Sequence, residues 1–167
     1  MFFLPNPKRH NFHDIMYYFA HISKFKGILH ICHISVPESV KIVGNARKYV
    51  DFKITLGLTP HHVLFYDELM NKNNGLILKV NPPLRTFKMC EELLENLFSG
   101  KIDWIESDHA PHNLKNKLNY PYSSGIWGMR LYKYFINFLK QKKIDEVLLR
   151  KITCDNIVNT FSIKGVS

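Results

Sequence analysis

The sequence has few cysteines and no long apolar run. Its three cysteines, Cys32, Cys90 and Cys154, lie far apart and show no CxxC spacing. They argue against a disulfide framework and favour a reducing compartment, which predicts a cytoplasmic protein. Residues 1–10 are interrupted by prolines and bases, so they predict neither a secretory leader nor a membrane span.

Several functional motifs are also missing. The chain has no phosphate-binding loop, no nucleophile elbow and no dinucleotide-binding fingerprint. The formal net charge is +9, but the lysines are dispersed, with one short cluster at 140–143. Because a nucleic-acid-binding face needs charge gathered in one place, we expect a solvated surface, and a basic nucleic-acid-binding domain ranks low.

What the sequence does contain is an alternation of strand and helix patterns within 167 residues, of which 46% are hydrophobic. That length predicts a single domain over 1–167, and it is short of the roughly 250 residues of a complete eight-fold α/β barrel. The alternation predicts an α/β fold with a parallel sheet and crossover helices. Expected strands cover 28–34, 52–58, 76–80 and 102–107, and expected helices cover 11–26, 35–49 (opened by a Ser35/Glu38 capping box), 87–98, 127–141, 144–151 and 153–161.

Polar clusters follow three of these strands, at 30–33, 59–62 and 108–112. In parallel α/β folds, ligands gather at the carboxyl ends of strands. A strand-end histidine and Asp108 would make a plausible divalent-metal pair, and Asp108 could also move a proton. His30 and His33 are three positions apart in the expected strand, so they should face opposite sides of the sheet. The alternatives are structural histidines, a turn or N-cap role for Asp108, and a Cys32 that is either a soft ligand or a buried apolar residue.

These clusters, in this order, resemble the dihydroorotases of the amidohydrolase superfamily. The resemblance implies a partial (β/α)8 TIM barrel that covers about the last three βα units. Allantoinases and dihydropyrimidinases share the strand order and rank lower. The matching strings are HICHIS (30–35), TPHH (59–62), KVNPPLR (79–85), SDHAPH (107–112) and DNIVNTFSIKG (155–165).

The resemblance implies a reaction and a set of site residues. The reaction would be the reversible, zinc-dependent hydrolysis of dihydroorotate to N-carbamoyl-L-aspartate, a step of pyrimidine synthesis. His33 and Asp108 match metal ligands, and Asp108 also matches the general acid and base. Asn81 and His112 match groups that hold the substrate, and the loop at Gly125 matches a stretch whose backbone contacts the substrate ring.

The chain also departs from the family pattern. The family's HxH motif, its carboxylated lysine or aspartate and its strand-five histidine cannot be placed. Gly57 replaces a glutamate, residues 125–130 read GIWGMR where GxPGLE is usual, and the glutamates that usually follow DHAPH are absent from 112–117. His61 and His62 match a family signature that we interpret as structural.

One histidine and one aspartate fall short of the three protein ligands that catalytic zinc normally has. We therefore expect the isolated chain to be inactive and to need a complementary N-terminal fragment. An open barrel fragment would also expose strand edges, which predicts self-association. The alternative is a non-catalytic remnant that acts as an assembly partner of aspartate transcarbamoylase.

Overall fold

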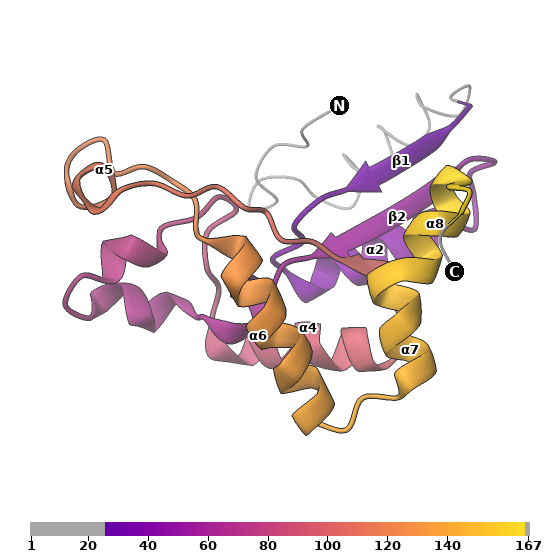
Figure 1. Cartoon of the computed structure of the whole chain (residues 1–167). Helices are drawn as coiled ribbons and strands as arrows, with labels where there is room; N and C mark the ends of the chain where they lie inside the picture. The colour runs from indigo at the N-terminus through magenta and orange to yellow at the C-terminus, as the bar shows by residue number, and fades with distance from the viewer. Residues whose placement is uncertain (1–25, 166–167) are drawn as a thin grey trace.

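The computed structural model describes residues 26–165, so the helix predicted over 11–26 falls almost entirely outside the described residues. Within that range a small parallel sheet packs against helices that alternate with its strands along the chain, as predicted (Figure 1). The elements in chain order are β1 (Ile28–Ile31), α2 (Pro37–Ala46), β2 (Lys53–Leu58), α3 (His61–Leu64), η2 (Asp67–Asn71), η3 (Gly75–Leu78), α4 (Phe87–Phe98), β3 (Trp104–Ile105), α5 (Leu114–Leu118), α6 (Gly128–Gln141), α7 (Glu146–Arg150), η4 (Lys151–Asp155) and α8 (Asn156–Phe161).

The sheet has the order β1-β2-β3, and both neighbouring pairs are parallel. Ile28 lies opposite Lys53, and Gly57 lies opposite Trp104. Since the strands run in the same direction, their carboxyl ends meet at one edge of the sheet. The segments that follow β1, β2 and β3 therefore start from the same side of the molecule.

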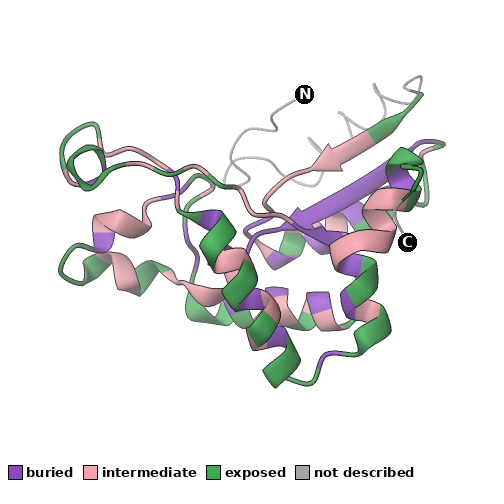
Figure 2. Cartoon of the chain, viewed as in Figure 1, coloured by how far each residue is buried: buried purple, intermediate pink, exposed green. Residues whose placement is uncertain are grey.

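Strand β2 is buried over most of its length, and its two faces differ in chemistry. Ile54, Leu56 and Leu58 belong to the apolar core, which also contains buried side chains of α2, α4 and α6. Successive side chains of a strand point to opposite faces, so Thr55 and Gly57 lie on the other face. Figure 2 shows the buried central strand flanked by helices that are buried on one side only.

Most helices lie within a few residues of their predicted bounds. Helix α4 matches its prediction, and the Thr86 side chain caps it by accepting a hydrogen bond from the Met89 amide. Asp145 caps α7 in the same way through the Leu148 amide. The two helices predicted at the C-terminal end are continuous, because a π-helical turn, η4, joins α7 to α8.

Two local predictions are wrong. Residues 76–80 form no strand: Asn74 has a left-handed φ of 62°, and the backbone after it continues into the 3-10 helix η3. Ser35 and Glu38 form no capping box, because α2 begins at Pro37 after an extended Val36 without a side-chain cap. The Ser35 hydroxyl instead accepts a hydrogen bond from Arg85 Nε at 3.1 Å.

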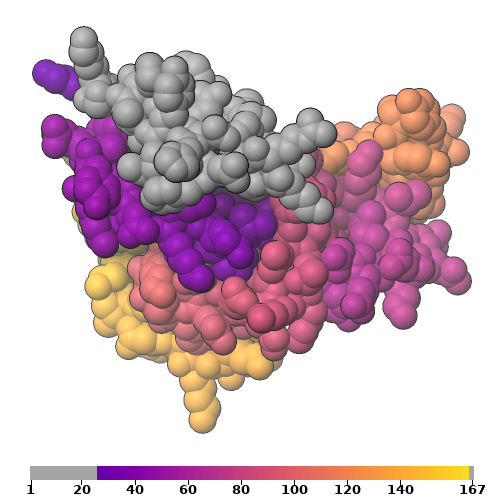
Figure 3. All heavy atoms as spheres, turned by 180° about the vertical axis from the view of Figure 1, so that it is seen from behind, coloured from indigo at the N-terminus to yellow at the C-terminus, as the bar shows by residue number. Residues whose placement is uncertain are grey.

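Seen from behind, the segment that carries η2 and η3 projects to one side of the molecule, together with the loop that carries α5 (Figure 3). Helices η3 and α5 are in contact. The two projecting segments thus form a shelf next to the carboxyl ends of the strands (Figure 1). None of the helices within residues 26–165 has the length and apolar character needed to span a membrane.

Candidate metal and substrate site

The residues that follow β1 and β3 turn sharply out of the sheet. Strand β1 ends at Ile31, and His33 lies two residues beyond it with a φ of 39°. Asp108 lies past β3 with a φ of 42°. Strand β1 therefore does not extend to His33, so the predicted strand alternation does not determine how His30 and His33 face. Both predicted metal ligands, His33 and Asp108, extend from the same edge of the sheet.

Asp108 lies in a half-buried position between ionisable groups. Its Oδ2 atom is 3.8 Å from Nε2 of His61. Burial raises the pKa of the Asp108 carboxyl, the nearby His33 acts to lower it, and the negative charge of Glu106 acts to raise it again, with a net rise. A carboxyl group with a raised pKa exchanges protons more readily near neutral pH, which suits a general acid and base.

His33 combines a fixed backbone with an unpaired ring nitrogen. Its backbone N–H donates to Glu106 Oε2 at 2.9 Å. Its Nδ1 atom is buried and has no hydrogen-bond partner among the described residues. A buried imidazole nitrogen without a partner is a suitable metal ligand. His33 and Asp108 thus fit part of a zinc site, and they supply two of the three protein ligands that a catalytic zinc needs.

His61 and His62 are buried at the start of α3, directly after β2, and are hydrogen-bonded within the chain. His62 Nε2 faces the Pro82 carbonyl at 3.0 Å, so it carries the proton and donates. His62 Nδ1 then accepts from the Thr59 hydroxyl at 2.7 Å, and His61 Nε2 donates to the same hydroxyl at 3.1 Å. This arrangement supports the structural interpretation for His62, whose two ring nitrogens are both bonded, whereas His61 Nδ1 is buried without a hydrogen-bond partner among the described residues.

The predicted substrate residues His112 and Gly125 lie together beside the shelf. His112 Nε2 donates to the Ser124 carbonyl at 3.0 Å. Gly125 has a φ of 135°, and a β-carbon there would lie 2.4 Å from the Ala110 carbonyl oxygen, so only glycine fits. Its amide donates to the Lys79 carbonyl, two residues before the exposed Asn81. The structure therefore brings the three predicted substrate segments to one region.

Lys117 holds these segments in place and was not predicted. The residue is only 3% exposed, and its ammonium group donates to the carbonyls of Lys79 and Gly125, both at 2.7 Å. Burial lowers the pKa of Lys117, and the nearby Lys79 lowers it further. No sequence pattern indicates this role, because a lysine within a polar loop normally lies on the surface.

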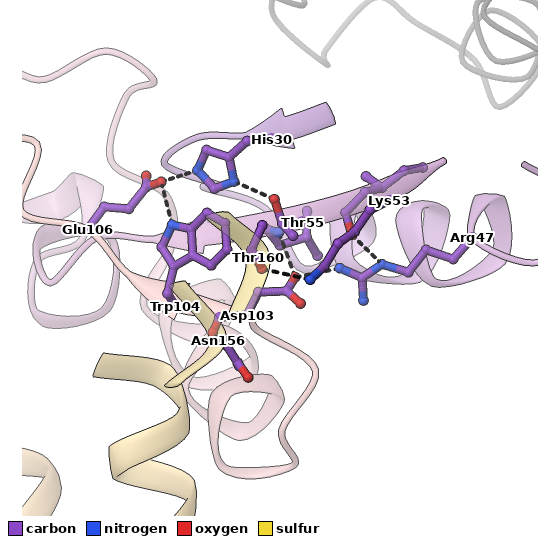
Figure 4. Close-up of polar contacts among 11 residues, drawn as sticks. His30, Arg47, Lys53, Thr55, Asp103, Trp104, Glu106, Asn156 and Thr160 are labelled. Carbon is purple, nitrogen blue, oxygen red and sulfur yellow. Dashed lines mark hydrogen bonds and ion pairs between the residues drawn. The ribbon is translucent and has the colours of Figure 1, made fainter. Parts of the chain in front are cut away.

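A second group of polar side chains was predicted only in part: the polar cluster at 30–33 was recognised, with Cys32 as a soft ligand among the alternatives, but Glu106 was missed. We name His30, Cys32 and Glu106 the interior cluster. His30 and Glu106 lie together beside Thr55 and Trp104, on the face of the sheet opposite the apolar core (Figure 4). The Glu106 carboxylate contacts His30 Nε2 and accepts from the indole N–H of Trp104 at 3.2 Å. Burial acts to raise the pKa of Glu106, but its hydrogen bonds, first that with His30, hold the pKa below its usual value.

Sequence relatives point to one enzyme family, although no family model matches the chain. A dihydroorotase of Fusobacterium nucleatum is 35% identical over 138 residues, which are 80% of this chain and 32% of that protein. A dihydroorotase of Staphylococcus aureus is 45% identical over 83 residues, or 50% of this chain and 19% of that protein. The chain is dihydroorotase-like. It spans about a third or less of the length of these relatives.

Solved structures show the fold of this dihydroorotase-like chain. An L-hydantoinase (dihydropyrimidinase) from Arthrobacter aurescens superposes with a TM-score of 0.79 at 20% identity, covering 92% of this chain and 35% of the hydantoinase. The dihydroorotase of Saccharomyces cerevisiae, solved with 5-fluoroorotic acid, superposes with a TM-score of 0.74 at 19% identity. The superposition covers 92% of this chain and 43% of that dihydroorotase. The fold is thus part of an amidohydrolase TIM barrel, as predicted.

Proposed function

We propose that the chain contributes its strand-end residues to a dihydroorotase, which hydrolyses dihydroorotate reversibly to N-carbamoyl-L-aspartate in the cytoplasmic synthesis of pyrimidines. The observation that carries the proposal is the placement of His33 and Asp108 at one edge of the sheet, with the substrate segments beside them. The similarity to dihydroorotases selects this substrate among cyclic amides.

Each residue has a proposed part in the reaction. His33 and Asp108 would hold a zinc ion, which when bound activates water and polarises the carbonyl that is attacked. Asp108, with its raised pKa, takes the proton of the attacking water and passes it to the ring nitrogen that leaves. Asn81, His112 and the Gly125 backbone orient the substrate, while Lys117 fixes the two loops that carry them.

Further ligands are needed to complete the zinc site. His33 and Asp108 alone fall short of three protein ligands, so the remaining ones come from another segment that carries the HxH part of the site. This requirement makes a complementary chain the proposed partner.

The test is a complementation assay. The chain is mixed with zinc and with the remaining two thirds of the Fusobacterium nucleatum dihydroorotase, and N-carbamoyl-aspartate is measured. We expect turnover in the mixture and none with either part alone. Asp108→Asn should lower the rate by at least about 100-fold, the usual scale for a general acid–base group. Asp145→Asn is the matched control, because asparagine can still cap α7.

Two results would contradict the proposal. Turnover that is unchanged by Asp108→Asn would remove Asp108 from the mechanism. A folded, zinc-loaded mixture without turnover would instead favour the non-catalytic alternative, an assembly partner of aspartate transcarbamoylase, and copurification with that enzyme would then test it.

A further inference from the structure

We propose that the interior cluster is a second metal site, in which His30 Nε2, Cys32 Sγ and a Glu106 carboxylate oxygen bind one zinc-like divalent ion. Within residues 26–165, these three side chains form a group whose potential ligand atoms all lie within 4.8 Å of one another. None of them belongs to the His33 and Asp108 pair on which the proposed function depends.

The donor atoms suit zinc among the common divalent ions. Imidazole nitrogen, thiolate sulfur and carboxylate oxygen are its three usual protein ligands, and three ligands leave a fourth position for water. Magnesium and calcium prefer oxygen ligands only, so a cysteine and a histidine in the same site disfavour both.

Neighbouring groups already hold His30 in the orientation that a ligand needs. Its Nδ1 atom lies 2.9 Å from the Thr55 hydroxyl, and its ring stacks on Trp104 with centroids 4.4 Å apart (Figure 4). When Nδ1 donates its proton to Thr55, the lone pair of Nε2 faces Glu106. Metal-bound histidines in proteins commonly donate their other ring nitrogen in this way, which fixes tautomer and ring orientation.

Glu106 is held equally firmly. The His33 backbone N–H binds Oε2, and the Trp104 indole N–H binds Oε1. Bare Nε2 and a carboxylate oxygen repel each other, so the contact between His30 and Glu106 requires a cation between them, either a proton or a metal ion. Cys32 lies beside this contact, two residues after His30, and so provides the third ligand.

Gly57 makes room for this arrangement. A β-carbon at residue 57 would lie 2.1 Å from both Cδ and Oε1 of Glu106, well inside van der Waals contact. The carboxylate thus occupies the space where a side chain at 57 would begin. The glycine that departs from the family pattern is therefore a requirement of the interior cluster.

Cobalt(II) is a suitable probe, because it takes zinc sites and its bond to a thiolate gives a charge-transfer band in the near ultraviolet. The full chain, freed of metal with a chelator, is titrated with cobalt(II). We expect one ion bound with this band, and displacement of the ion by zinc. Cys32→Ser should abolish the band, and Cys154→Ser, at another half-buried cysteine, should retain it.

Two further variants test the geometry. Thr55→Val leaves all three ligands in place and removes only the partner of His30 Nδ1, so the affinity should fall by roughly 10- to 100-fold. The double variant His33→Asn with Asp108→Asn removes the strand-end pair and should keep the band. Circular dichroism spectra that match the parent chain show which variants are folded.

The proposal is overturned by a band that survives Cys32→Ser, or by one that disappears in the folded double variant and so belongs to the strand-end pair. Absence of any cobalt binding to the folded parent chain also overturns it. A complementation assay without turnover would leave these results unaffected, because they are read from the spectrum and not from activity.

Discussion

Two groups of polar residues that contain histidine lie near the carboxyl edge of the sheet, and the surroundings of their histidines differ. In the TPHH turn (residues 59–62), His61 and His62 are at most 2% exposed and are bonded to a hydroxyl and a carbonyl. In the interior cluster, the His30 side chain is 21% exposed and faces a carboxylate. Burial lowers the pKa of His61 to about 3, with His62 and His33 adding to the effect, and lowers that of His62 to about 4.

Position at a strand end therefore does not by itself make a histidine functional. A histidine held neutral by burial and bonded to uncharged partners contributes to folding. A histidine that faces a carboxylate and a thiol, with some access to solvent, can take a proton or a metal ion. The groups that contact each histidine decide its role, and they come from segments far apart in the sequence.

Truncating His62 should cause the largest loss of stability and so show most clearly that the TPHH histidines serve folding. His62→Ala removes a buried ring and leaves the Thr59 hydroxyl and the Pro82 carbonyl without their partner, so we expect a loss of about 3–4 kcal/mol in the free energy of unfolding. His109→Ala is the control: His109 is exposed, and within residues 26–165 its ring accepts a single 3.3 Å bond, from the Met129 amide. The His109→Ala variant should lose less than about 1 kcal/mol in the free energy of unfolding. Urea denaturation measures both, and equal losses would contradict the structural role of His62.

The sequence predicted the fold well where local signals and tertiary packing agree. Helix α4 combines an apolar stripe with the Thr86 cap, and both point to the same bounds. The segment 76–80 is apolar like a strand, but its sequence could not reveal that no neighbouring strand pairs with it. The capping box failed because α2 begins at Pro37, so Ser35 precedes the N-cap residue Val36, and its hydroxyl bonds to Arg85 instead.

Within the site, the sequence located the strand-end residues and missed their supports. His33, Asp108 and His112 stand in recognisable strings. Glu106 gives no such signal, because its meaning depends on the space at Gly57 on the neighbouring strand. Such a pairing between strands is set by the sheet register, which no local pattern specifies.

Acid should lower the free energy of unfolding through protonation of His62 in the TPHH turn. Because His62 has a pKa of about 4 when folded, against 6.5 ordinarily, the unfolded chain binds more protons at this residue between these values. Its contribution to stability is therefore complete above pH 6.5 and is lost as the pH falls toward 4, by up to about 3 kcal/mol. Denaturation midpoints measured from pH 7 to pH 4.5 test this expectation.

His62→Gln is the control for this effect, because glutamine keeps an amide donor and cannot be protonated. In this variant the loss of stability between pH 7 and pH 4.5 should be smaller than in the parent chain by about 2 kcal/mol. An identical loss in both chains would show that other groups cause the acid sensitivity.

The smallest expected loss of stability comes from the same substitution, threonine to valine, made at each of two buried threonines. Thr59→Val removes the hydroxyl that serves both His61 and His62, and it leaves two buried ring nitrogens unpaired, so we expect a loss of about 2–3 kcal/mol. Thr55→Val, measured with a chelator present, removes the partner of His30 Nδ1 alone, at a ring that solvent can reach. Its loss should be about 1 kcal/mol, since water can replace the hydroxyl. A larger loss at Thr55 than at Thr59 would mean that His30 serves folding first, and the contrast between the two groups would disappear.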